Sequence, residues 1–162
     1  MEKEHFIYDY YLNIVKPTVA EFLADKSNLR RGRLAAIVLD HVRDYRAVQL
    51  KVSPTKVLES MEGECRDGVF IRDVCNASKH AILNQPSKIP RTLSHTKQVM
   101  AEENEGMFTA PFGQSMFGES NYVFIKFDKA QELNGERIST RNLHDSINQV
   151  IIYWDKLLNI NS

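Results

Sequence analysis

The chain lacks the features that mark several large classes of protein. Its 162 residues include only two cysteines, Cys65 and Cys75, so neither a disulfide framework nor the paired spacing of a structural zinc site is present. No apolar run is long enough to cross a bilayer, and the charged N-terminus lacks the apolar core of a secretory signal. We therefore expect a cytoplasmic protein that has no membrane partner.

An excess of charge of either sign is also absent. The 21 lysines and arginines balance 21 aspartates and glutamates, so no global field attracts nucleic acid or an anionic membrane. The sequence contains neither a phosphate-cradling glycine loop nor a dinucleotide fingerprint, and its five histidines include no i, i+4 pair of metal ligands. We expect neither a cofactor nor a metal ion.

The first half of the chain predicts a bundle of helices. Residues 2–25 fit one helix that kinks at Pro17, and residues 30–50 fit a second helix. Ser53 and the proline after it open a short third helix, and a fourth helix covers about 67–83. In the second helix one side is apolar, and we expect that side to face the core: Leu34, Ile37, Val38, His41, Val42, Tyr45 and Val48.

The second half predicts a small β element and a final helix. The run "NYVFIKFD" has the β-branched and aromatic composition of a strand, and "LNGE" supplies the Asn-Gly turn of a hairpin. The segment 105–120, rich in glycine and aromatic residues, suits a loop. A helix capped by Ser139 or Thr140 follows, and its apolar residues keep helical spacing to the end of the chain: Leu143, Ile147, Val150, Ile151, Trp154 and Leu158.

These elements predict a single domain, 1–162, of the mainly α (α+β) class. A helical bundle formed by residues 1–84 is followed by a loop and a small antiparallel β-hairpin insert, 85–138. The C-terminal helix, 139–162, is expected to pack back onto the bundle.

The stretch "FIRDVCNASKHAILN", residues 70–84, concentrates polar side chains on the fourth helix. At about 100° per residue, Arg72, Asn76 and His80 fall on one half of the helix with Asp73 at its margin, while apolar residues occupy the other half. A cation, an amide and an imidazole within two turns can hold a phosphate and transfer a proton near neutral pH. We take these four residues as a candidate catalytic site, although an amphipathic surface helix has the same pattern.

An arginine followed by a polar residue and, further along the same helix, by a histidine resembles the HEPN superfamily, many of whose members are metal-independent RNases of toxin and defence systems. The resemblance implies that Arg72 stabilises charge on the phosphate, that Asp73 takes the polar place after it and that His80 transfers a proton. It also implies an RNA substrate and a homodimer, since the family's site lies at a dimer interface. Seven residues separate Arg72 from His80, where the family usually has four to six.

The phrase "RDVCNASKH" also resembles a group of uncharacterised bacterial proteins that carry an Asn-Ala-Ser-Lys-His motif. That likeness covers more of the chain than the HEPN resemblance, which reaches the first four helices, but it implies no activity.

Two further groups are candidates for supporting roles. Arg30, Arg31 and Arg33 open the second helix and, with Lys79, are candidate nucleic-acid-binding residues. His41 has Asp44 three residues further on, so the two side chains are within reach of each other on a helix. This pair is either a structural contact or a second part of the site.

Three interpretations of function remain open. The first is a HEPN-like, metal-independent endoribonuclease of a toxin or defence type. The second is a non-catalytic protein that binds nucleic acid or a nucleotide, and the third is an oligomeric interaction protein without enzymatic activity.

Overall fold

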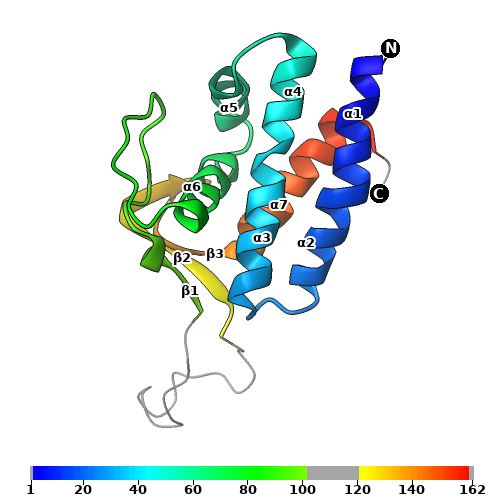
Figure 1. Ribbon diagram of the computed structural model, residues 1–162. Coiled ribbons are helices and arrows are strands. Elements are labelled where there is room, and N and C mark those ends of the chain that lie inside the picture. The colour runs from blue at the N-terminus through cyan, green and yellow to red at the C-terminus, as the bar shows by residue number, and fades with distance from the viewer. Residues whose placement is uncertain (1, 102–120, 161–162) are drawn as a thin grey trace, which may run out of the picture.

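The protein is mainly helical, with a three-stranded antiparallel sheet that precedes the last helix (Figure 1). A computed structural model describes residues 2–101 and 121–160. The predicted class, a helical bundle with a small β insert, is therefore confirmed. The segment 105–120, predicted as a loop, lies outside the described residues.

The N-terminal rod consists of α1 (Glu2–Tyr10), the π-helical turn η1 (Tyr11–Val15) and α2 (Lys16–Leu23). Its irregularity comes just before Pro17, as the sequence predicted, because proline has no N–H to donate to the preceding turn and the turn widens. One stripe of this rod faces the core: Ile7, Tyr11, Val15, Val19 and Phe22 are buried.

The predicted second helix is in fact two helices, α3 (Leu29–Asp40) and α4 (Val42–Leu50), which meet at His41. The predicted core face was wrong, because only Val42 of its seven residues is buried. Leu34, Tyr45 and Val48 are 43%, 37% and 65% exposed. The inner side carries mostly small residues instead: Gly32, Ala35, Ala36, Leu39, Val42 and Ala47.

Close packing explains why small residues turn inward. A Cβ atom added to Gly32 would lie 2.9 Å from a side-chain carbon of Leu143 and 3.0 Å from the ring of Phe22. Helix α3 therefore approaches its neighbours at a distance that larger side chains would prevent. Hydrophobic periodicity instead selects the opposite side of the helix, because the bulky apolar residues lie there.

Helices α5 (Pro54–Glu62) and α6 (Asp67–Lys79) follow. Ser53 caps α5 as predicted, since its side chain accepts the N–H of Lys56. Helix α6 ends at Lys79 rather than near residue 83, and His80 has an extended backbone with φ −132° and ψ 134°. Every residue from Asp67 to Cys75 is buried, so α6 is the central helix of the bundle and not an amphipathic surface helix.

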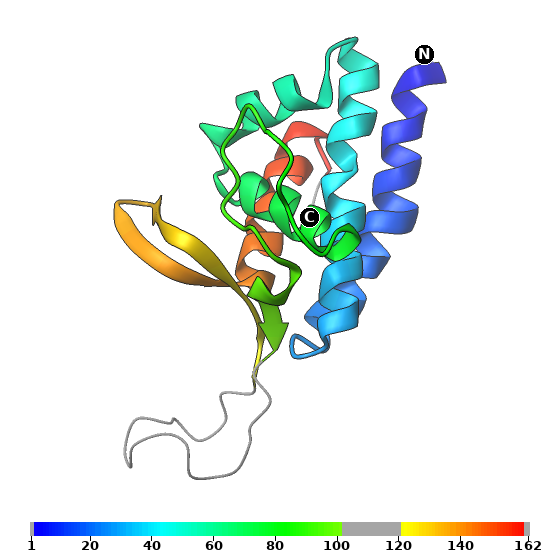
Figure 2. The same cartoon turned by 60° about the vertical axis from the view of Figure 1, so that its left-hand side comes forward.

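The sheet has the order β1-β2-β3, with β1 (Val99–Ala101), β2 (Val123–Leu133) and β3 (Glu136–Asn142). The short turn η2 (Thr96–Gln98) leads into β1. The predicted Asn-Gly hairpin turn is confirmed, because Asn134 and Gly135 have φ values of 51° and 81°, as a type I′ turn requires. Figure 2 shows the β2–β3 hairpin reaching away from the helices.

The final helix α7 (Leu143–Leu157) begins directly after β3. Ser139 and Thr140 lie within β3 and do not cap it, because strand pairing continues as far as Asn142, which pairs with Phe124. The predicted apolar spacing is confirmed for five of its six residues, since Ile151 is half-buried whereas the others are buried: Leu143, Ile147, Val150, Trp154 and Leu158. Among the described residues, no helix has both the length and the apolar character needed to span a membrane.

Candidate functional site

Arg72 lies inside the protein, with only 4% of its surface exposed. Its Nε atom donates a hydrogen bond to Asp73 Oδ1 at 2.7 Å. Its two terminal nitrogens donate to Ser87 Oγ, to the carbonyl of Ile89 and to the carbonyl of Pro90, at 3.0, 3.0 and 3.2 Å. The guanidinium is therefore occupied by its own chain and is not presented to a phosphate.

Asp73, the carboxylate partner of Arg72, is completely buried. Its Oδ2 atom accepts hydrogen bonds from the backbone N–H and the hydroxyl of Thr92, both at 2.7 Å. The guanidinium of Arg91 lies 3.9 Å from Oδ1. Together Arg72 and Asp73 hold the connector of residues 85–92 against α6. A buried ion pair whose hydrogen bonds are made within the protein has a structural role.

The other polar residues of the stretch lie at the end of α6. Asn76 is half-buried, whereas Lys79 and His80 are exposed. Because the helix ends at Lys79, the side chain of His80 does not follow the helical wheel that placed it beside Arg72. Among the described residues, no hydrogen bond or ion pair joins Arg72 to His80.

Arg33 connects α3 to this end of α6. Its guanidinium donates to the carbonyl of Ala77 at 3.2 Å, to both the hydroxyl and the carbonyl of Thr96 at 2.9 Å, and to the carbonyl of Val99 at 3.0 Å. Four hydrogen bonds to the chain itself make Arg33 a structural link. Burial lowers the pKa of this arginine, in agreement with a side chain removed from water.

The segment after α6 pairs with the segment that leads to β1. The N–H of Thr96 donates to the carbonyl of Ala81 at 3.0 Å, and Ile82 forms a β-bridge with His95. His80 and Lys97 therefore flank a bonded pair, which brings the exposed residues of these two segments close together. We define the α6-end surface as Lys79, His80, His95 and Lys97.

The remaining predicted residues lie elsewhere on α3 and α4. Arg30 is exposed, and the guanidinium of Arg31 is 3.7 Å from the carboxylate of Asp25. His41 and Asp44 approach each other as predicted, but His41 Nε2 is 4.0 Å from the carboxylate, which is a weak contact between half-exposed side chains.

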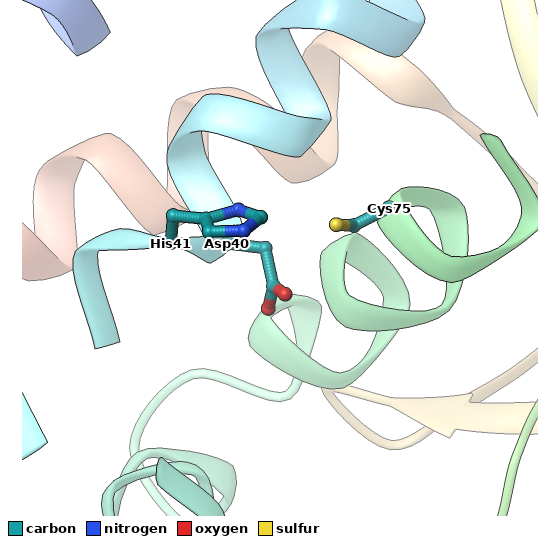
Figure 3. A group of neighbouring side chains, drawn as sticks. All are labelled: Asp40, His41 and Cys75. Carbon is teal, nitrogen blue, oxygen red and sulfur yellow. The ribbon is translucent and has the colours of Figure 1, made fainter. Parts of the chain in front are cut away.

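A cluster that the sequence did not indicate lies where α3 meets α6. The potential ligand atoms of Asp40, His41 and Cys75 are all within 4.8 Å of one another (Figure 3). Asp40 and Cys75 are buried, and Arg43 donates two hydrogen bonds to the Asp40 carboxylate, at 2.8 and 3.0 Å. The sequence contains no signal for this cluster, because Cys75 is far along the chain from the other two residues.

Burial, together with the nearby carboxylate of Asp40, raises the pKa of the Cys75 thiol to about 12. The thiol is therefore protonated at neutral pH, whereas a nucleophilic cysteine needs its thiolate. This excludes Cys75 as an activated nucleophile in the structure as it stands.

An open hollow of about 430 Å³ lies between the turn after α5, the β2–β3 turn and α7. Its lining combines acidic and basic side chains, among them Glu64, Glu132, Arg66 and Lys156. Arg66 is paired with Glu62 and with Gln131. The hollow therefore presents no cluster of a single charge that would select a ligand.

Comparisons with known protein families, with curated proteins and with solved structures found no match. What the chain does is therefore inferred from its own contacts and surfaces.

Proposed function

We propose that the protein is a homodimeric interaction protein in which two copies pack through α1, α3 and α4. The observation that supports this proposal is an apolar face that the described part of the chain leaves uncovered. We call it the α1/α4 face and define it by seven residues: Phe6, Tyr10, Ile14, Leu34, Val38, Tyr45 and Val48. Phe6 and Val48 are 61% and 65% exposed, and Ile14 and Leu34 are 46% and 43% exposed.

Contacts of Tyr10 join the α1 side of this face to α3 and α4. Its ring stacks on the ring of Tyr45, with centroids 4.3 Å apart, and its hydroxyl donates to the carbonyl of Val38 at 2.7 Å. Phe6 and Ile14 lie one turn to either side of Tyr10, and Leu34 and Val48 extend the row on α3 and α4. The bulky apolar residues that the sequence assigned to the core therefore gather on the surface.

The α1/α4 face extends over roughly four turns of helix. Leu34 and Val48 are separated by about 20 Å along the helix axes at 1.5 Å per residue, and the face is two helices wide. With two helix widths of ~10 Å each, its footprint is roughly 400 Å², about half of the ~800 Å² that each partner buries in a standard interface. Two such faces across a two-fold axis would form a four-helix arrangement, which buries apolar stripes efficiently.

This placement differs from the dimer implied by the HEPN resemblance, which has the fourth helix near the two-fold axis. Helix α6 is covered by its own chain from Asp67 to Cys75. An interface there would require the bundle to open, whereas the α1/α4 face is already on the surface.

A charge in the α1/α4 face is expected to separate the dimer. Val48→Glu should raise the dimer dissociation constant at least 100-fold, because the carboxylate would lose its water in the interface. The wild type is expected at about twice 18.7 kDa by light scattering coupled to size exclusion, and the variant at the monomer mass.

The matched control is Ile152→Glu, on α7, where the isoleucine is 59% exposed. This variant should remain dimeric, and circular dichroism should show that both variants are folded. A wild type that is monomeric at about 100 µM, or a control that dissociates as readily as Val48→Glu, would refute the proposal.

A second candidate function, non-catalytic binding of RNA, is favoured by the α6-end surface. Four exposed lysine and histidine residues from two segments lie there. The acidic residue near this surface, Asp128, accepts hydrogen bonds from Ser94 and Gln98. Lysine and histidine side chains at a surface can contact successive phosphates of a single strand. We do not extend this proposal to cleavage, because the guanidinium of Arg72 is occupied inside the protein.

Removal of two lysines from the α6-end surface is expected to weaken RNA binding. In Lys79→Ala/Lys97→Ala, affinity for a single-stranded RNA should fall about tenfold near 100 mM salt. The slope of log K against log [salt] should decrease in magnitude by about 1.4, since each phosphate contact contributes ~0.7. Fluorescence anisotropy across a salt series measures both quantities.

The control Lys51→Ala/Lys56→Ala removes the same charge from two other exposed lysines and should bind like the wild type. Absence of binding by the wild type at 50 mM salt would reject the second candidate. RNA that the wild type cuts in EDTA, and that His80→Ala leaves intact, would instead support the HEPN-like RNase interpretation.

A further inference from the structure

The cluster of Asp40, His41 and Cys75 has the composition of a metal site. The three side chains come from the end of α3, its cap position and α6, and Figure 3 shows the ring of His41 and the thiol of Cys75 facing each other with Asp40 beside them. Their potential ligand atoms lie within 4.8 Å of one another. In a tetrahedral zinc site the donor atoms are roughly 3.4–3.6 Å apart, which follows from bond lengths of 2.0–2.3 Å. Side-chain rotations that move these atoms by about 1 Å would close the site.

His41 has the hydrogen bond that a metal-binding histidine usually makes. Its Nδ1 atom lies 2.7 Å from the carbonyl of Ile37, one turn earlier in α3. A carbonyl can only accept, so Nδ1 carries the proton in the neutral ring and Nε2 has a free lone pair. The nearest acidic group to Nε2 is Asp44, at 4.0 Å.

Asp40 is oriented by Arg43. The two hydrogen bonds from Arg43 use one lone pair on each carboxylate oxygen and leave a second lone pair on each. Metal-binding carboxylates are commonly held by a second group in this way.

Cys75 is the third candidate ligand, and it is completely buried. Burial holds its thiol in the protonated form, so the metal must displace the proton: a bond forms between Sγ and the cation, and H⁺ leaves to the solvent.

We propose that Asp40, His41 and Cys75 bind one divalent transition-metal cation of the Zn²⁺ type. A thiolate, an imidazole and a carboxylate form a donor set that suits Zn²⁺ and Co²⁺ and is too soft for Mg²⁺ or Ca²⁺. Three protein ligands leave a fourth position for water or another ligand. The bound cation would connect the junction of α3 and α4 to α6. This metal-site proposal does not depend on the proposed dimer.

The test measures metal binding by the reduced, full-length protein. Zn²⁺ titrated against a chelating dye should bind at one equivalent per chain with a dissociation constant in the micromolar range or below. Co²⁺ should produce a thiolate-to-metal charge-transfer band in the near ultraviolet, which reports a cobalt–sulfur bond. Cys75→Ser should abolish that band and weaken Zn²⁺ binding at least 100-fold.

Two controls separate this site from other metal-binding side chains. Cys65→Ser removes the other cysteine, and His95→Ala removes a surface histidine near His80; both variants should bind Zn²⁺ like the wild type.

His41→Gln, at a half-exposed position, keeps the test valid if Cys75→Ser fails to fold, and it should also weaken binding at least 100-fold. Absence of binding at 100 µM Zn²⁺, or wild-type affinity in Cys75→Ser or His41→Gln, would overturn the proposal.

Discussion

Replacement of Asp73 by alanine is expected to lower the free energy of unfolding by about 3–5 kcal/mol. The carboxylate is completely buried and accepts hydrogen bonds from Arg72 and from two donors of Thr92. Its loss would leave a guanidinium charge inside the protein without its partner. Most domains of this size are stable by only 5–15 kcal/mol, so the variant would be marginally folded.

Urea denaturation followed by circular dichroism measures this effect. Asp9→Ala removes an exposed carboxylate that contacts Asn13, and it should change the stability by less than about 0.5 kcal/mol. The double variant Arg72→Met/Asp73→Leu removes both charges and should recover part of the loss. A loss below about 1 kcal/mol for Asp73→Ala would show that the pair does not hold the connector of residues 85–92.

The same contacts affect how an Arg72 variant would be interpreted. Arg72→Ala removes four hydrogen bonds and takes from the buried carboxylate of Asp73 its nearest cation. Loss of any activity in this variant could therefore follow from unfolding. His80 and Lys79 are exposed, so their variants test a role in binding or catalysis without this complication.

Trp154→Ala is expected to cost about 3–5 kcal/mol for a different reason, the cavity left in the core. Trp154 is 1% exposed, and it borders the region where Leu39, Leu58 and Val150 meet. The surrounding helices can fill only part of the space that the indole vacates, so lost contacts add to lost burial.

The same denaturation experiment measures the change. Ile152→Ala is a matched control on the same helix, since Ile152 is 59% exposed and its truncation should cost less than about 1 kcal/mol. Equal losses for the two variants would mean that α7 is not packed on the bundle as described.

The sequence by itself determined the elements whose signals are local. The Asn-Gly turn has positive φ at both positions, a requirement that asparagine and glycine meet and most residues do not. Ser53 caps α5 through a bond to a residue three positions away. The spacing of Leu143, Ile147 and Trp154 predicted the buried side of α7, because bulky residues face the core in that helix.

Only the tertiary structure decided what depends on contacts between distant segments. The charged residues in the middle of α6 suggested either a catalytic site or a surface helix, but Asp73 is bound inside the protein by Thr92 of the connector. A charged residue can be buried when its hydrogen bonds are satisfied, and the sequence of the helix does not show whether they are.

Tertiary packing also decided which side of α3 and α4 faces inward. Close approach to neighbouring helices at Gly32 selected the small residues for the core and left Leu34 and Val48 outside. The cluster of Asp40, His41 and Cys75 depends on the same packing, since it exists only where α3 crosses α6. Periodicity shows that a helix has an apolar side, but the shapes of its neighbours decide whether that side is covered.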